Sequence, residues 1–133
     1  MTLGGCGIDV VDVRRIDRLL RRHGEAFINR WFARSEIAFC ADAQKPAIRF
    51  AACLAAKEAA MKVLHLDSRG RIPWGQIEIG GWLTTPAHVR LWGEPAEAAA
   101  RLGIGRIFVS VSSDDRIATA VAFGEICESR GSS

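Results

Sequence analysis

The spacing of apolar residues changes partway along the chain, and this change restricts the fold more than any other feature. From Asp12 to Leu64 the apolar residues recur at the spacing of amphipathic helices. From Gln76 onward they alternate with polar residues, as they do in strands. Helices followed by strands are typical of α+β domains. The sequence therefore predicts a chiefly antiparallel sheet packed on a long helix.

The first half of the chain should contain one strand and four helical segments. We expect a strand over Leu3–Val11 and a helix that Asp12 caps and that ends at His23-Gly24. Two short helical pieces follow, EAFINRWF and SEIAFCADA, and Ser35 is the expected cap of the second. Pro46 suits the first turn of the long helix, which should run to about Leu64.

The second half should be mostly β. Four strands are expected, in the segments QIEIGGWL, AHVRLW, RIFVSVSS and RIATAVAFGEI, with a short helix, EPAEAAARLG, between the second and the third. Asp114-Asp115 predicts a tight turn and hence a hairpin. With 133 residues and no internal repeat, we expect a single domain over residues 1–126 and a flexible tail over 127–133.

Cysteine usage and hydropathy indicate a cytoplasmic protein. The four cysteines are scattered without a CxxC motif, so buried reduced thiols are expected rather than disulfides or a zinc site. No apolar run approaches the ~20 residues that span a bilayer. The N-terminus lacks the basic region of a signal peptide. We therefore expect no membrane segment.

Positive charge is concentrated near the N-terminus. The net charge is +3, and nine of the 18 lysines and arginines fall between Arg14 and Arg49. In the first helix, five arginines lie opposite the apolar stripe: Arg14, Arg15, Arg18, Arg21 and Arg22. This surface is either a solvated face or a docking surface for an acidic partner. Nucleic acid is not expected, because the remaining charge is balanced and no aromatic residues interleave with the arginines.

Three residues could form a charged site. Glu58 and Lys62 lie one turn apart on the long helix among alanines, either as a surface ion pair or as an enclosed site that needs a partner. Asp9 interrupts an apolar strand, either as the strand end or as a carboxylate held on a rigid element. Two carboxylates without a nearby histidine or cysteine favour Mg²⁺ together with substrate phosphates. Lys62 could then neutralise phosphate oxygens.

With these residues in hand, the chain resembles the holo-(acyl-carrier-protein) synthases, a class of 4′-phosphopantetheinyl transferases. GIDVVDVRRID is similar to the first family motif, and RFAACLAAKEAAMKVL is similar to the second. FARSEIAFC and FVSVSSDDRIATAVAF support the resemblance, which covers nearly the whole chain.

The resemblance implies a fold, a reaction and a set of site residues. It implies a trimer of small α+β subunits that moves phosphopantetheine from coenzyme A to a serine of an acyl carrier protein and releases 3′,5′-adenosine bisphosphate. Either Glu58 or a metal-held water would take the proton of that serine. The residues carried over are the magnesium ligands Asp9 and Glu58, the phosphate contact Lys62, the coenzyme A contacts His65, Pro86, Ser112 and Ser113, and the carrier-docking residues Arg14, Arg18 and Arg21.

The chain departs from the family pattern at several positions. Cys53 stands where the family has a basic residue, and Ser113 where it has a histidine. Leu54, Met61, His65 and Thr84 also differ from the family pattern. These departures leave an alternative, a relative that docks carrier proteins and binds or processes their cargo without transferring the arm.

Overall fold

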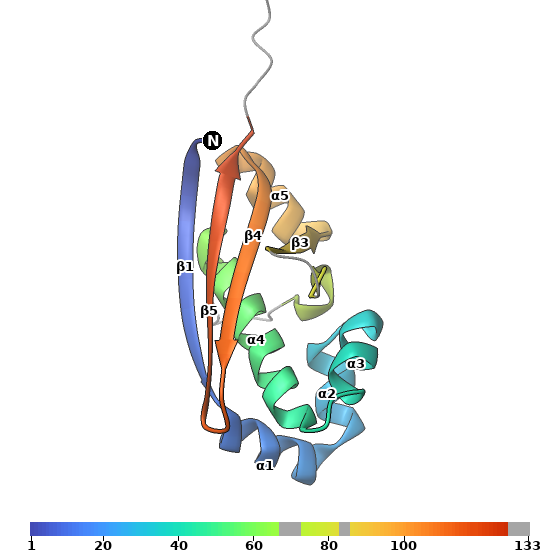
Figure 1. Cartoon of the computed structure of the whole chain (residues 1–133). Helices are drawn as coiled ribbons and strands as arrows, with labels where there is room; N and C mark the ends of the chain where they lie inside the picture. Colours follow the sequence, from blue (N-terminus) through green and yellow to red (C-terminus); the bar gives the residue numbers. More distant parts are fainter. Residues whose placement is uncertain (67–72, 83–85, 128–133) are drawn as a thin grey trace, which may run out of the picture.

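The computed structural model describes residues 1–66, 73–82 and 86–127, and the predicted α+β architecture is confirmed (Figure 1). The described residues form five strands and five α-helices, and a short 3₁₀ helix, η1 Trp74–Gln76, precedes β2. The helices are α1 Val13–His23, α2 Glu25–Trp31, α3 Arg34–Ala41, α4 Pro46–Val63 and α5 Gly93–Leu102. The strands are β1 Leu3–Asp12, β2 Ile77–Gly80, β3 Ala87–Leu91, β4 Ile104–Ser113 and β5 Ile117–Ile126.

All five strands form one antiparallel sheet in the order β1-β5-β4-β3-β2. The first and the last strand are therefore neighbours, and β1 forms one edge. Asp114 closes the predicted β4–β5 hairpin, because its carboxylate accepts the backbone N–H groups of Arg116 and Ile117 at 2.8 and 2.9 Å. These two bonds lower the pKa of Asp114.

The two faces of the sheet carry different residues, and the strand register shows which residues share each face. On the inner face, toward α4, most residues are small, namely Gly7, Ala118, Ala120, Ala122 and Gly124. A Cβ at Gly7 would collide with the carbonyl oxygen of Ala59 in α4. The alanines of α4 therefore pack directly on the backbone of β1 and β5, and Asp9 of β1 comes within reach of the helix.

The helices α1, α2 and α3 gather at the end of the sheet where β1 turns into α1 (Figure 1). Asp12 is the cap of α1, as predicted, and accepts the N–H of Arg14 at 2.9 Å. The predicted cap of α3 is wrong, because α3 begins before Ser35. The Glu36 carboxylate instead accepts the N–H of Ala33 at 2.7 Å. The backbone N–H at the N-cap position is therefore bonded by a side chain of the same helix.

The C-terminal end of α4 is a Schellman motif. The N–H of Leu66 bonds the carbonyl of Met61 at 3.0 Å, and the N–H of His65 bonds that of Lys62 at 3.2 Å. His65 takes the left-handed position of this motif with φ 57° and is exposed. A residue with a Cβ is strained in this conformation, which glycine adopts freely.

We expect His65→Gly to stabilise the fold by about 1 kcal/mol, since the left-handed strain is removed while both backbone hydrogen bonds remain. Urea unfolding of the variant and the parent measures the difference. As a matched control, Gly103→Ala should destabilise by a similar amount, because Gly103 also has a positive φ, 73°, and open space around it. Equal stability of His65→Gly and the parent would contradict the expectation.

The other expectations from the sequence have mixed outcomes. Cys40 and Cys53 are buried thiols, as predicted, whereas Cys6 and Cys127 are exposed, so the expectation of buried thiols is wrong for these two. None of the described helices combines the length and the apolar character needed to cross a bilayer. Leu83, at the end of the predicted strand QIEIGGWL, and the predicted tail beyond residue 127 lie outside the described residues.

Candidate metal and phosphate site

The contact between α4 and β1 brings together Asp9 and Lys62, two of the predicted site residues. The Lys62 ammonium donates to Asp9 Oδ1 at 3.0 Å and to the backbone carbonyl of Ile8 at 2.6 Å. Its ion-pair partner therefore comes from the sheet, and not from Glu58 one turn earlier on the same helix. The Asp9 side chain is 16% exposed and that of Lys62 is 53% exposed, so the lysine can reach solvent while the carboxylate is largely enclosed.

The Glu58 carboxyl group lies beside that of Asp9. Burial, a hydrogen bond to the Asp9 carboxyl group and the Asp9 charge raise the pKa of Glu58 from 4.5 to about 8, against the opposing effects of Arg15 and Lys62. Asp9 Oδ2 is buried, and apart from a protonated Glu58 it has no hydrogen-bond donor among the described residues. Two ionised carboxylates cannot satisfy each other, so this carboxyl pair, Asp9 and Glu58, needs either a proton or a cation between its oxygens.

The carboxyl pair fits a hard cation better than a transition metal. Mg²⁺ is commonly held by one or two carboxylates, with phosphates and water completing its coordination. Within the described residues, no group of three or more histidine, cysteine, aspartate or glutamate side chains could hold a metal. The donor set and the orphaned Asp9 oxygen fit Mg²⁺ bound together with a phosphate-bearing substrate.

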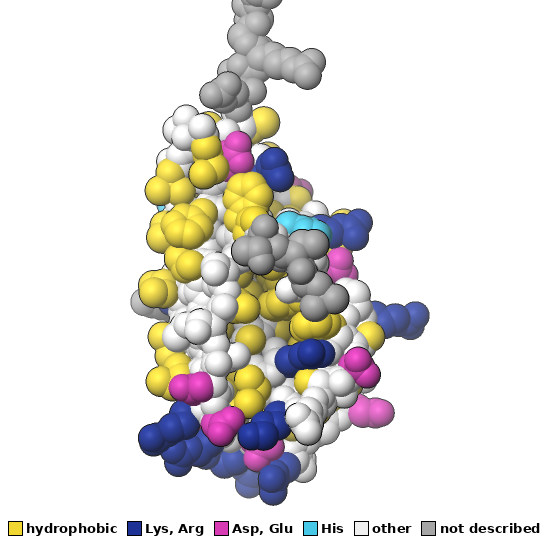
Figure 2. All heavy atoms as spheres, viewed as in Figure 1, with side chains coloured by type: hydrophobic (Ala, Val, Ile, Leu, Met, Phe, Trp, Pro, Cys, Tyr) yellow, Lys and Arg dark blue, Asp and Glu magenta, His cyan; other side chains and the backbone are white. Residues whose placement is uncertain are grey.

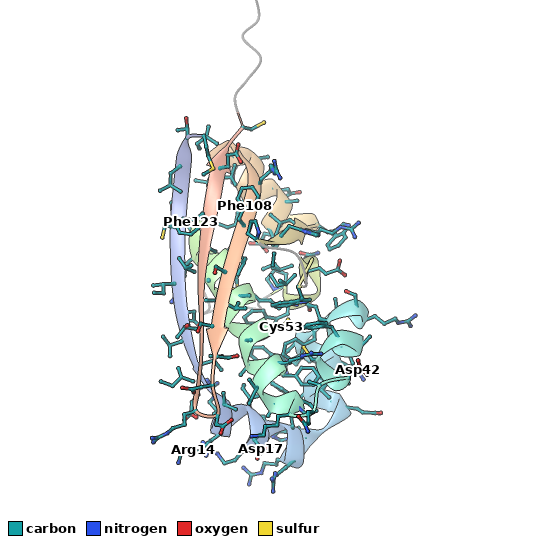
Figure 3. All side chains as sticks on the ribbon, in the orientation of Figure 1. Arg14, Asp17, Asp42, Cys53, Phe108 and Phe123 are labelled. Carbon is teal, nitrogen blue, oxygen red and sulfur yellow. The ribbon has the colours of Figure 1, made fainter. Side chains whose placement is uncertain are left out.

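The five exposed arginines of α1 form the arginine face, defined as Arg14, Arg15, Arg18, Arg21 and Arg22. Figure 2 shows basic side chains gathered over this end of the molecule. Arg21 pairs with Asp17 at 3.0 Å in solvent, and Arg14 lies near the β4–β5 hairpin at the same end (Figure 3).

Arg15 was missed by the sequence analysis as a site residue. Its positive charge lowers the pKa of Glu58, so it links the arginine face to the carboxyl pair. Its position in the sequence could have identified it, because Arg15 lies in the first turn of a helix that begins where β1 ends.

The four residues expected to contact coenzyme A lie elsewhere on the subunit. His65 is exposed beyond α4, and Pro86 is exposed before β3. Ser113 pairs with Ala118 on the inner face, whereas Ser112 pairs with Thr119 on the outer face. The structure therefore separates the two serines onto opposite faces of the sheet, and Thr84 lies outside the described residues.

Comparison with known proteins gives one consistent result. The family model of the 4′-phosphopantetheinyl transferase superfamily matches residues 5–122. A holo-[acyl-carrier-protein] synthase of Koribacter versatilis is 37% identical over 87% of this chain and 93% of the relative. One from Anaeromyxobacter dehalogenans is 40% identical over 91% of this chain and 94% of the relative.

Solved structures agree with these relatives. The holo-[acyl-carrier-protein] synthase of Neisseria meningitidis has a TM-score of 0.79 and 29% identity, covering 93% of this chain and 99% of that one. The Helicobacter pylori enzyme in complex with coenzyme A has a TM-score of 0.76 and 27% identity, covering 90% of this chain and 99% of that one.

Proposed function

Because this chain belongs to the 4′-phosphopantetheinyl transferase superfamily, as a holo-[acyl-carrier-protein] synthase, we propose that it transfers 4′-phosphopantetheine from coenzyme A to a serine of an apo acyl carrier protein. The observation that carries the proposal is the meeting of Asp9, Glu58 and Lys62 at the α4–β1 contact. A carboxyl pair beside a lysine suits a pyrophosphate substrate. The Helicobacter pylori relative, solved with coenzyme A, supports the choice of that substrate.

The chain's own residues supply most of the chemistry. Asp9 and Glu58 would hold Mg²⁺, which when bound neutralises part of the pyrophosphate charge. Lys62 turns from Asp9 to the phosphate oxygens and stabilises the charge on the leaving 3′,5′-adenosine bisphosphate. The carrier serine bonds to the β-phosphorus, the bond to the leaving bisphosphate breaks, and Glu58 takes the serine proton.

The arginine face is proposed to dock the carrier protein. It is exposed, it lies on α1 directly after the strand that holds Asp9, and Arg15 connects it electrostatically to Glu58. An acidic carrier docked on this face would present its serine toward the carboxyl pair. Charge complementarity of this kind mainly steers association.

We expect Arg18→Glu to raise the KM for the carrier roughly tenfold, the equivalent of about 1.4 kcal/mol, with kcat little changed. The reason is that Arg18 lies on the docking face and not at the carboxyl pair. Steady-state kinetics at two salt concentrations measure the effect, which should shrink at high salt. Arg101→Glu, on the exposed side of α5, is the matched control and should change neither constant. Equal effects of the two variants would contradict docking on α1.

A homotrimer is proposed from the outer face of the sheet, which no helix of the described chain covers in Figure 1. The outer face carries exposed apolar side chains, among them Ile8 at 64%, Val10 at 60% and Phe123 at 38%. Phe123 lies beside its cross-strand neighbour Phe108 in Figure 3. Ser112 shares this face, so a neighbouring subunit packed here would meet one of the expected coenzyme A contacts. Native mass spectrometry measures the oligomeric state.

One assay tests the transfer itself. The protein is incubated with an apo carrier, coenzyme A and Mg²⁺, and mass spectrometry detects the phosphopantetheine adduct on the carrier. We expect the adduct, and we expect it to disappear when EDTA removes the metal. If no adduct formed across several carriers while binding to them stayed measurable, the proposed transfer would be wrong.

A further inference from the structure

A second pair of charged residues lies in the core between α3 and α4. The ammonium of Lys57 lies 2.6 Å from Glu36 Oε1, and both side chains are fully buried. Glu36 Oε1 also accepts the N–H of Ala33, and Oε2 accepts that of Ile79 at 2.8 Å. One carboxylate thus joins the start of α3, the middle of α4 and the strand β2.

Stability alone does not explain this buried ion pair. Replacing such a pair with apolar residues of similar volume is often neutral or stabilising, because desolvation offsets the attraction between the charges. An ion pair is directional, whereas apolar packing is not. The Lys57 ammonium fits one place, where the Glu36 carboxylate is already fixed by two backbone donors.

The helix α4 gains from such a directional contact because half of its buried residues have very short side chains. Six of its twelve buried residues are alanines: Ala51, Ala52, Ala55, Ala56, Ala59 and Ala60. Helices settle into a defined rotation when large side chains form ridges that fit the grooves of a neighbour. Alanines form shallow ridges, and on β1 the helix meets the flat backbone at Gly7. Where these alanines meet the sheet, side-chain packing therefore fixes the rotation of α4 less firmly than large side chains would.

Lys57 directly precedes Glu58, and successive residues project about 100° apart around a helix. Fixing Lys57 toward α3 therefore sets the direction in which Glu58 points. The contact of Lys62 with Asp9 and Ile8 of the sheet is partly exposed. It is lost when Lys62 turns to the substrate, whereas the Lys57–Glu36 pair remains.

We propose that Lys57 and Glu36 are positioning residues, which hold α4 at the rotation that places Glu58 against Asp9. The inference rests on the proposed function, in which these two carboxyl groups form the divalent-cation site. It assigns a role in the reaction to two fully buried residues that touch neither substrate nor metal.

The test uses the double variant Lys57→Met/Glu36→Gln, in which no charge is left unpaired and the amide oxygen still accepts a backbone N–H. Electron paramagnetic resonance measures Mn²⁺ affinity, and kinetics at saturating Mg²⁺ and coenzyme A give kcat and the carrier KM. We expect Mn²⁺ affinity to fall about tenfold and kcat about 10- to 100-fold, as for residues that orient metal ligands. The KM for the carrier should stay unchanged, because the arginine face is intact.

Cys53→Ala is the matched control. Cys53 lies one turn before Lys57 on α4 (Figure 3) and is buried, and burial and the neighbouring Cys40 of α3 raise its pKa. The Cys53→Ala substitution loosens the same helix interface without removing the ion pair. Its Mn²⁺ affinity and kcat should therefore equal those of the parent. All comparisons are made at a temperature where each variant is folded by circular dichroism. If the double variant does not fold, Glu36→Asp, which keeps both charges but shortens the carboxylate side chain, is measured in the same way, with a smaller loss in the same direction expected.

Two outcomes would overturn the inference: a double variant that keeps its Mn²⁺ affinity and kcat, or a Cys53→Ala variant that loses them equally. A parent protein that binds Mn²⁺ but yields no carrier adduct would contradict the proposed function only. The Mn²⁺ measurement would then still decide whether the buried pair positions Glu58.

Discussion

Replacing Glu58 with glutamine should lower kcat/KM for transfer by about 10³-fold or more, since it removes both a metal-binding carboxylate and the proposed base. Glutamine keeps the shape of the side chain but cannot carry the negative charge that a divalent cation requires. The adduct assay under initial-rate conditions measures the loss. Glu97→Gln, on the exposed face of α5, is the matched control and should transfer at the parental rate. Transfer by Glu58→Gln within about tenfold of the parent would remove Glu58 from the site.

Without metal, the same variant should be at least as stable as the parent. Loss of activity can therefore be distinguished from loss of folding. The pKa of Glu58 is raised from 4.5 to about 8 in the folded protein. Between these two pH values the folded protein keeps the Glu58 proton, whereas the unfolded chain releases it. The parent therefore loses stability as pH rises from about 4.5 through 8. Glu58→Gln has no proton to lose there. Without divalent cations at pH 8, its melting temperature should equal or exceed that of the parent.

The largest effect on stability is expected for Lys57→Met, which should destabilise the fold by about 3–5 kcal/mol. The substitution leaves the Glu36 carboxylate charged and fully buried without its cation. Typical domains unfold at a cost of only about 5–15 kcal/mol, so the variant should be close to unfolding at physiological temperature. Urea unfolding followed by circular dichroism gives the free energy difference.

Two further variants show whether the unpaired charge is the cause. Adding Glu36→Gln to Lys57→Met should recover most of the lost stability, since the coupled pair is then neutral. Lys45→Met removes another lysine–carboxylate contact, to Asp115 at 3.3 Å, but both side chains are exposed. That variant should cost less than about 1 kcal/mol. If Lys57→Met cost no more than Lys45→Met, the buried pair would not bear on stability.

Much of this fold follows from local sequence patterns. The period change, the Asp12 cap, Pro46 and the Asp114 turn each act within a few residues, and the structure has the predicted element at each. The meeting of Asp9 with Glu58 and Lys62 was also predicted, although the sequence could not show that Lys62 pairs with β1. That contact depends on how closely α4 approaches the sheet.

What sequence reasoning missed depends on contacts between distant segments. The partner of Lys57 is Glu36, which lies 21 residues earlier and on another helix. The wrong cap at Ser35 has the same origin, because Ser35 donates to Glu78, 43 residues away, while Glu36 turns back to Ala33. Such side chains satisfy tertiary partners that no local pattern specifies.

The strand order also sets when the site can form during synthesis. β1 lies at the edge of the sheet, and its one neighbour among the described strands is β5, which follows the other four strands along the chain. Asp9 is held in place by that pairing, opposite Ala120. A nascent chain that already has α4, and therefore Glu58 and Lys62, still lacks a fixed first strand until residues 117–126 are made. In the proposed site, metal binding should therefore begin only after residues 117–126 have been made, so that it can report this step of folding.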